Sequence, residues 1–186
     1  MLYLGSQSPR RRQLMAGLDI DFECVSIDCD ETFPEELRGA DIPLYLSQLK
    51  ADAYRHKLND GDTLITADTI VWCDNHMLGK PRDKADAVRM LQLLSGREHE
   101  VITGVCLTTK QKRKTFSVTT KVRFAELTAK QIDYYVDKYK PFDKAGAYGI
   151  QEWIGSVGVE SIEGSYFNVM GLPVQRLYKE LGIIFN

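Results

Sequence analysis

Basic residues stand at an unusual place near the start of the chain, in the stretch GSQSPRRRQLM (5–15). Ser8 followed by Pro9 is typical of a helix N-terminus, where the backbone carries partial positive charge and repels neighbouring arginines. The placement becomes favourable if an anion binds there, because backbone N–H groups and guanidinium forks both suit phosphate oxygens. We therefore predict a phosphate-binding site at this helix start. Its expected ligands are Ser6, Ser8, Arg10 and Arg11.

A carboxylate interrupts the apolar and β-branched stretch LITADTIVW (64–72). Burying Asp68 is costly unless it is paired, hydrogen-bonded or bound to a cation. Two interpretations stay open: Asp68 lies at a strand end or bulge where it reaches water, or it is a metal ligand or general base. The acidic segment DCDETFPEELRG (28–39) reads as a loop with a solvated charge run, yet its Glu31 together with Asp68 would suffice to bind Mg²⁺ on substrate phosphates.

Two lysines and a glutamine stand in settings that suit a ligand but also have simpler interpretations. Lys50 lies at the edge of a helical apolar stripe, which is typical of a lysine that extends along the surface to water. Lys80 lies between glycine and proline in LGKPR, a frame that fixes the backbone, although a lysine at a hairpin end is the commoner case. Gln151 ends the glycine-rich loop DKAGAYGIQ, and its amide suits a nucleobase edge.

The composition is that of one ordinary globular domain of 186 residues. A net charge of -2 lacks the basic excess of a duplex nucleic-acid binder. The four cysteines and three histidines show no zinc-site spacing, and we interpret His99 as structural. No signal-peptide pattern and no membrane-length apolar run is present in the sequence. These features indicate a cytoplasmic protein with reduced thiols and no membrane segment.

The elements that must position these residues alternate between strands and helices, which predicts a mixed α/β sheet with flanking helices. We expect strands over 2–4, 22–27, 63–72, 77–78, 101–109 and 115–124, the last two joined by a basic hairpin tip at 110–114. We expect helices from Pro9 to about Ala16, from Pro43 to about Lys57, over 84–94, from the cap Thr128 to about Tyr139, and from Pro173 to near Gly182. A strand or two should lie between the loop 143–151 and residue 171.

Six motifs together resemble the Maf family of nucleoside triphosphate pyrophosphatases. They are SQSPRRRQLM, ADTIV, LGKPRD, SGREHEVITGV, DKAGAYGIQ and GSYFNVMGLP, in the family's order from residue 6 to 173. The resemblance implies hydrolysis of a nucleoside triphosphate to the monophosphate and pyrophosphate with a divalent metal, Mg²⁺ or Mn²⁺. It also implies a single domain over 1–186 with two lobes around a cleft, a fold similar to that of inosine triphosphate pyrophosphatases, and homodimers.

The resemblance assigns roles to individual positions of this chain. Asp68 falls on the family's proton acceptor, and Glu31 falls on its acidic-loop residue, so that both would hold the metal. The family's basic residues fall on Arg11, Lys50 and Lys80.

Three further positions match the branch of the family that is associated with dTTP and UTP. These are Arg10, Thr69 and Gln151, which differ from the sister branch associated with 7-methyl-GTP. Two alternatives stay open: a pyrophosphatase for a purine or modified nucleotide, and a nucleotide-binding regulator of septum formation. No feature of the chain points to a cell-division partner.

Overall fold

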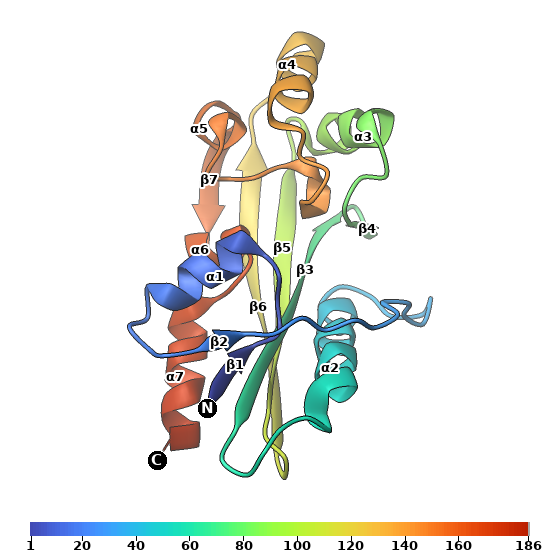
Figure 1. Cartoon of the computed structure of the whole chain (residues 1–186). Coiled ribbons are helices and arrows are strands. Elements are labelled where there is room, and N and C mark those ends of the chain that lie inside the picture. Colours follow the sequence, from blue (N-terminus) through green and yellow to red (C-terminus); the bar gives the residue numbers. More distant parts are fainter. Residues whose placement is uncertain (186) are drawn as a thin grey trace. The chain divides into compact units, whose positions relative to one another are not determined.

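The protein was analysed as a computed structural model, which describes residues 1–185 and the side chains of residues 1–182 (Figure 1). A seven-stranded sheet has the strand order β2-β1-β3-β5-β6-β7, with β4 paired to β3. β1 is parallel to both β2 and β3, whereas β4 and β7 are antiparallel to β3 and β6, so the sheet is mixed as predicted. The strands are β1 (Leu2–Leu4), β2 (Glu23–Cys24), β3 (Thr63–Cys73), β4 (His76–Leu78), β5 (Glu98–Thr108), β6 (Arg113–Phe124) and β7 (Val159–Glu163).

Three of the helices begin where the sequence offers capping groups. Ser8 caps the first helix by accepting a hydrogen bond from the backbone N–H of Arg11, Asp83 caps the third, and Thr128 forms a complete capping box with Gln131. These predictions are confirmed. The helices are α1 (Pro9–Ala16), α2 (Asp41–Arg55), α3 (Lys84–Leu94), α4 (Ala129–Tyr139), η1 (Ala145–Ala147), α5 (Trp153–Gly158), α6 (Tyr166–Met170) and α7 (Val174–Phe185).

Several expected boundaries are wrong. The strand expected over 22–27 contains only Glu23–Cys24, because only these residues pair with β1. The segment between 152 and 170, where only strands were expected, contains α5 and α6 as well as β7. The last helix continues past Gly182, whose Cα faces open space, because buried Leu177 and Leu181 keep its apolar face against the core.

The chain groups into two compact units. The first unit comprises Met1–Thr69, Thr103–Val118 and the residues from Gly171 onward, and the second comprises Ile70–Ile102 and Thr119–Met170. The strands β3, β5 and β6 contribute residues to both units. The single two-lobed domain with a cleft stays a prediction. Among residues 1–185, the structure contains no helix that is long and apolar enough to cross a membrane.

The first unit holds the helices α1, α2 and α7 around its strands. In Figure 1, α2 lies on one side of these strands, and α1 and α7 lie on the other. Its core consists of fully buried aliphatic side chains, which include Leu4, Met15, Ile65, Leu107 and Leu177.

The second unit holds α3 to α6, η1, β4 and β7. Its core is more aromatic than that of the first unit. The largest buried side chains include Leu91, Leu94, Phe124, Tyr135 and Ile154.

Candidate active site

Asp68 lies in the middle of β3 and is paired. Its side chain is only 14% exposed, and its Oδ1 accepts a hydrogen bond of 2.7 Å from Nζ of Lys50. The preceding residue, Ala67, is buried. The interpretation of Asp68 as a strand end open to water is therefore wrong. The cost of withdrawing its carboxylate from water is offset by the ammonium partner.

Lys50 reaches Asp68 because α2 packs closely on the sheet. Gly104 of β5 makes this possible, since a Cβ at that position would lie 2.3 Å from the carbonyl carbon of Pro43 in the first turn of α2. In addition, Thr66 Oγ1 donates a hydrogen bond of 2.6 Å to the carbonyl of Ser47, one turn before Lys50 on the same helix face. The Lys50 side chain is 13% exposed. The interpretation of a lysine extended into water is wrong.

A second carboxylate contacts the same ammonium group. Glu31 Oε2 lies 3.2 Å from Lys50 Nζ, and the Glu31 side chain is 55% exposed. Glu31 belongs to the segment between β2 and α2, as expected for a loop, where Asp30 Oδ1 accepts the backbone N–H of Thr32. Two carboxylates thus converge on one cation. Their hard oxygen donors fit Mg²⁺ or Mn²⁺, although the described residues contain no group of three or more metal-ligating side chains.

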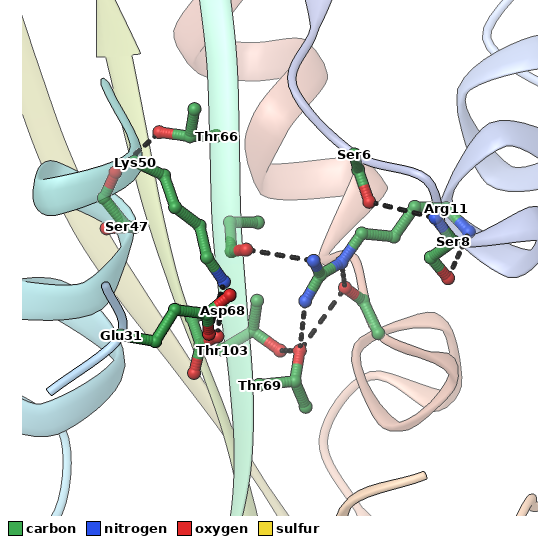
Figure 2. Close-up of polar contacts among 12 residues, drawn as sticks. Ser6, Ser8, Arg11, Glu31, Ser47, Lys50, Thr66, Asp68, Thr69 and Thr103 are labelled. Atoms are coloured by element: carbon green, nitrogen blue, oxygen red, sulfur yellow. Dashed lines mark hydrogen bonds and ion pairs between the residues drawn. The ribbon is translucent and has the colours of Figure 1, made fainter. Parts of the chain in front are cut away.

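The Arg11 side chain extends from α1 to β3 and to the segment before α7 (Figure 2). Its Nη1 donates to the carbonyl of Ala67 at 2.8 Å, its Nη2 donates to Thr69 Oγ1 at 3.0 Å, and its Nε donates to the carbonyl of Gly171 at 2.8 Å. These contacts use three of the five guanidinium N–H donors. Among the described residues, two donors are left for an anion, and the plane of the group is fixed.

The charges near Arg11 are mixed in sign. Burial lowers the pKa of the Arg11 guanidinium, with a further lowering from the positive charge of Arg10, while Asp68 and Glu31 oppose the shift. A negatively charged ligand would relieve the repulsion between the two arginines. The phosphate-binding site at this helix start stays a prediction.

The two predicted serines shape the backbone before α1. Ser6 Oγ accepts the N–H of Ser8, and Ser8 Oγ accepts the N–H of Arg11. Each hydroxyl therefore acts as an acceptor toward the protein and keeps its own proton to donate to a ligand.

Lys50 and Arg11 contact adjacent residues of β3 and do not compete for the same partner. Successive strand residues point to opposite sides, so Asp68 meets Lys50 while Thr69 meets Arg11. Figure 2 shows the two cations approaching β3 from opposite sides. The sequence analysis missed Thr103, which is fully buried. Its hydroxyl oxygen lies 2.9 Å from the hydroxyl oxygen of Thr69. Its motif was recognised, but nothing in the motif indicated the partner.

Lys80 and Gln151 belong to the second unit, so the structure does not relate them to the residues of the first. Lys80 is exposed and follows β4. Its loop is joined to the glycine-rich loop by the hydrogen bond from Gly146 N–H to the carbonyl of Gly79, at 3.1 Å. Gln151 is exposed in the turn before α5. The structure therefore connects the loops of these two predicted residues with each other.

Comparisons with known proteins identify the family. A model of the family described as Maf-like protein matches residues 1–183. The protein named dTTP/UTP pyrophosphatase from Bacteroides thetaiotaomicron is 55% identical over 97% of this chain and 94% of its own length. A protein of the same name from Parabacteroides distasonis is 56% identical with the same coverage.

A solved structure shares the fold at low identity. The Staphylococcus aureus Ham1 protein matches with a TM-score of 0.55 and 16% identity, over 96% of this chain and 98% of that chain. This likeness shows a common α/β fold alone. The family model and the close relatives together show that the chain belongs to the Maf-like proteins.

Proposed function

We propose that this protein is a nucleoside triphosphate pyrophosphatase that hydrolyses dTTP and UTP to the monophosphate and pyrophosphate. Relatives at 55 and 56% identity bear the name dTTP/UTP pyrophosphatase, which supports this substrate class. The observation that carries the proposal is the environment of two adjacent residues of β3. Asp68 pairs with the Lys50 ammonium and Thr69 pairs with the Arg11 guanidinium, so two oriented cations flank one carboxylate.

We propose that Glu31 and Asp68 hold the divalent ion, Mg²⁺ or Mn²⁺. Their oxygens already converge on one positive charge, that of Lys50, which supports this assignment. When bound, the ion would neutralise phosphate charge and lower the pKa of a coordinated water.

The residues of this chain then have separate tasks. Asp68 accepts the proton of the water that attacks the α-phosphorus, and pyrophosphate leaves. Arg11 and Lys50 bind the triphosphate and orient it, because fixed charges supply most of the acceleration in phosphoryl chemistry. The hydroxyls of Ser6 and Ser8 donate to phosphate oxygens from the start of α1.

Four assignments rest on the resemblance of motifs. Lys80 binds phosphate, and Arg10, Thr69 and Gln151 distinguish pyrimidine nucleotides from others. A panel of nucleotide substrates tests these assignments with variants of each residue. Loss of a phosphate ligand should weaken the binding of all nucleotides alike, whereas loss of a base contact should change the order in which the enzyme prefers them. A purine or modified nucleotide as the best substrate would favour the alternative reading of the specificity.

The decisive experiment compares Asp68→Asn with a matched control. Wild-type protein with Mn²⁺ should release pyrophosphate from dTTP, so that orthophosphate appears only after a separate inorganic pyrophosphatase is added. Asp68→Asn should lower kcat by roughly a hundredfold or more, the usual contribution of a positioned general base. Asp60→Asn, an exposed carboxylate in the same unit, should keep full activity. Full activity of Asp68→Asn would remove the proposed base.

We further propose that the enzyme acts on free nucleotides in the cytoplasm and forms a homodimer. The net charge of -2 argues against a nucleic-acid substrate. Sedimentation equilibrium measures the oligomeric state, and a monomer at micromolar concentration would contradict the dimer.

A further inference from the structure

The Thr69 hydroxyl has its hydrogen-bonding capacity filled by the protein. A hydroxyl carries one proton and two acceptor positions. Arg11 Nη2 donates to Thr69 Oγ1 at 3.0 Å, and Thr69 Oγ1 donates to the carbonyl of Gly171 at 3.3 Å. The remaining partner is Thr103 Oγ1 at 2.9 Å. Because the Thr69 proton is used on a carbonyl that can only accept, Thr103 must be the donor in this third contact.

We propose that Thr103 is a positioning residue, and that it acts through Thr69 to fix the Arg11 guanidinium for binding the phosphates of the substrate. In this arrangement the Thr69 hydroxyl influences phosphate binding through Arg11, in addition to the role in substrate specificity that the motif assigns to this residue. The inference rests on the proposed function, because it concerns how that site holds a triphosphate.

The residues around the contacts from Thr103 through Thr69 to Arg11 hold these side chains rigidly. Thr103 is fully buried in β5, where its side chain has little freedom to turn to another partner. The carbonyl of Gly171 accepts from both Arg11 Nε and Thr69 Oγ1. Gly171 has φ of +122°, a conformation that favours glycine, so the direction of this carbonyl depends on the residue type. The Arg11 plane is thus set from several sides by groups that do not move independently.

Removing the Thr103 hydroxyl should loosen Arg11 without changing the charge of the site. Thr103→Val keeps the shape of the side chain, but it leaves Thr69 with an unfilled acceptor and with freedom to rotate. The expected effect is the loss of one net hydrogen bond, which corresponds to about a fivefold weaker binding of phosphates. Thr103→Ser keeps the hydroxyl and should bind as the wild type does.

Inorganic tripolyphosphate separates the two roles of Thr69, because it has phosphates but no base. Calorimetric titration in one Mg²⁺ buffer gives the affinities of wild type, Thr103→Val and Thr103→Ser for tripolyphosphate and for dTTP. Thr108→Val is the matched control, since Thr108 is a fully buried threonine of the same strand with a hydroxyl contact to Cys106. We expect Thr103→Val to weaken both ligands by the same factor, and the control to leave both unchanged.

Three outcomes overturn the inference: dTTP weakened with tripolyphosphate unaffected, neither ligand weakened, or the same loss in the Thr108→Val control. Thr103→Ala removes the same hydroxyl with a different volume and replaces Thr103→Val if the latter does not fold. Failure of the proposed function would look different. Wild-type protein would then bind tripolyphosphate with the expected dependence on Thr103, yet it would not hydrolyse dTTP or UTP.

Discussion

Acidification should destabilise this protein through one buried histidine, His99 of β5. Its side chain is 2% exposed, and its Nε2 lies 2.7 Å from the hydroxyl of Tyr148. The imidazole packs edge-on against the rings of Phe124 and Tyr148, at centroid distances of 5.0 and 5.4 Å. Its Nδ1 is buried without a partner among the described residues. Burial lowers the pKa of His99 from 6.5 to about 4, because a charged ring would lose its hydration there.

The magnitude follows from the difference between the folded and unfolded pKa values. Between pH 6.5 and pH 4 the unfolded chain binds a proton at His99 that the native state does not, so the free energy of unfolding falls as the pH falls. Each pH unit in this window removes about 1.4 kcal/mol. The loss from this residue is therefore about 2 kcal/mol at pH 5, and it approaches roughly 3 kcal/mol near pH 4. At pH 7 both states are neutral and the effect is absent.

Urea unfolding between pH 7 and pH 5 measures how much His99 contributes to the pH dependence of the free energy of unfolding. His99→Phe keeps an aromatic ring and removes the titration, so its free energy of unfolding should fall by about 2 kcal/mol less than that of the wild type over this range. Subtracting the two curves cancels the carboxylates that titrate in both proteins. The exposed His56 is the control, because His56→Asn should leave the wild-type slope in place. Identical slopes for wild type and His99→Phe would refute the reasoning.

Two further predictions concern α2. Lys50→Met removes the ammonium between two carboxylates, so nucleotide-free protein should bind Mn²⁺ roughly tenfold more tightly, a change of ~1.4 kcal/mol. A titration followed by electron paramagnetic resonance measures this affinity. An unchanged affinity would contradict the idea that Mn²⁺ and the Lys50 ammonium share one position. Gly104→Ala places a methyl group 2.3 Å from a backbone atom of Pro43, so it should cost about 3 kcal/mol in urea unfolding and lower turnover as well. Gly182→Ala, which faces open space, should not destabilise.

Local features of the fold could be predicted because the relevant atoms are close in sequence. The cap of α1 involves Ser8, Pro9 and Arg11, and the capping box of α4 involves Thr128 and Gln131. The mixed sheet and the family were also predicted and are confirmed, since alternating strands, helices and ordered motifs extend along the whole chain.

Elements without a sequence period could not be predicted in this way. The helices α5 and α6 have 6 and 5 residues, which is too short for a helical pattern to show. The strand β2 has only two residues, because its pairing with β1 and not its own composition decides where it ends. Tertiary contacts determine such elements.

In the candidate site, too, features that are local in sequence could be predicted, whereas long-range contacts could not. Asp68 and Arg11 were singled out from their motifs, and Lys50 from the resemblance to the family, but the partners of these residues were not predicted. The contacts of Arg11 with Ala67 and Gly171 are separated by 56 and 160 positions along the chain. The simpler interpretations, Lys50 extended into water and Asp68 at an exposed strand end, failed because each side chain satisfies the other, and a sequence scanned one segment at a time does not show that pairing. The interpretation of Asp68 as a metal ligand or general base stays a prediction.

The bond between Arg11 and Gly171 has a consequence for biosynthesis. Arg11 emerges from the ribosome early, whereas the carbonyl that holds its Nε is added 160 residues later. Until then the nascent polypeptide carries the guanidinium without one of its anchors, and Thr69 lacks the acceptor for its proton. The Arg11 guanidinium therefore reaches its fixed orientation only after the segment before α7 has been synthesised.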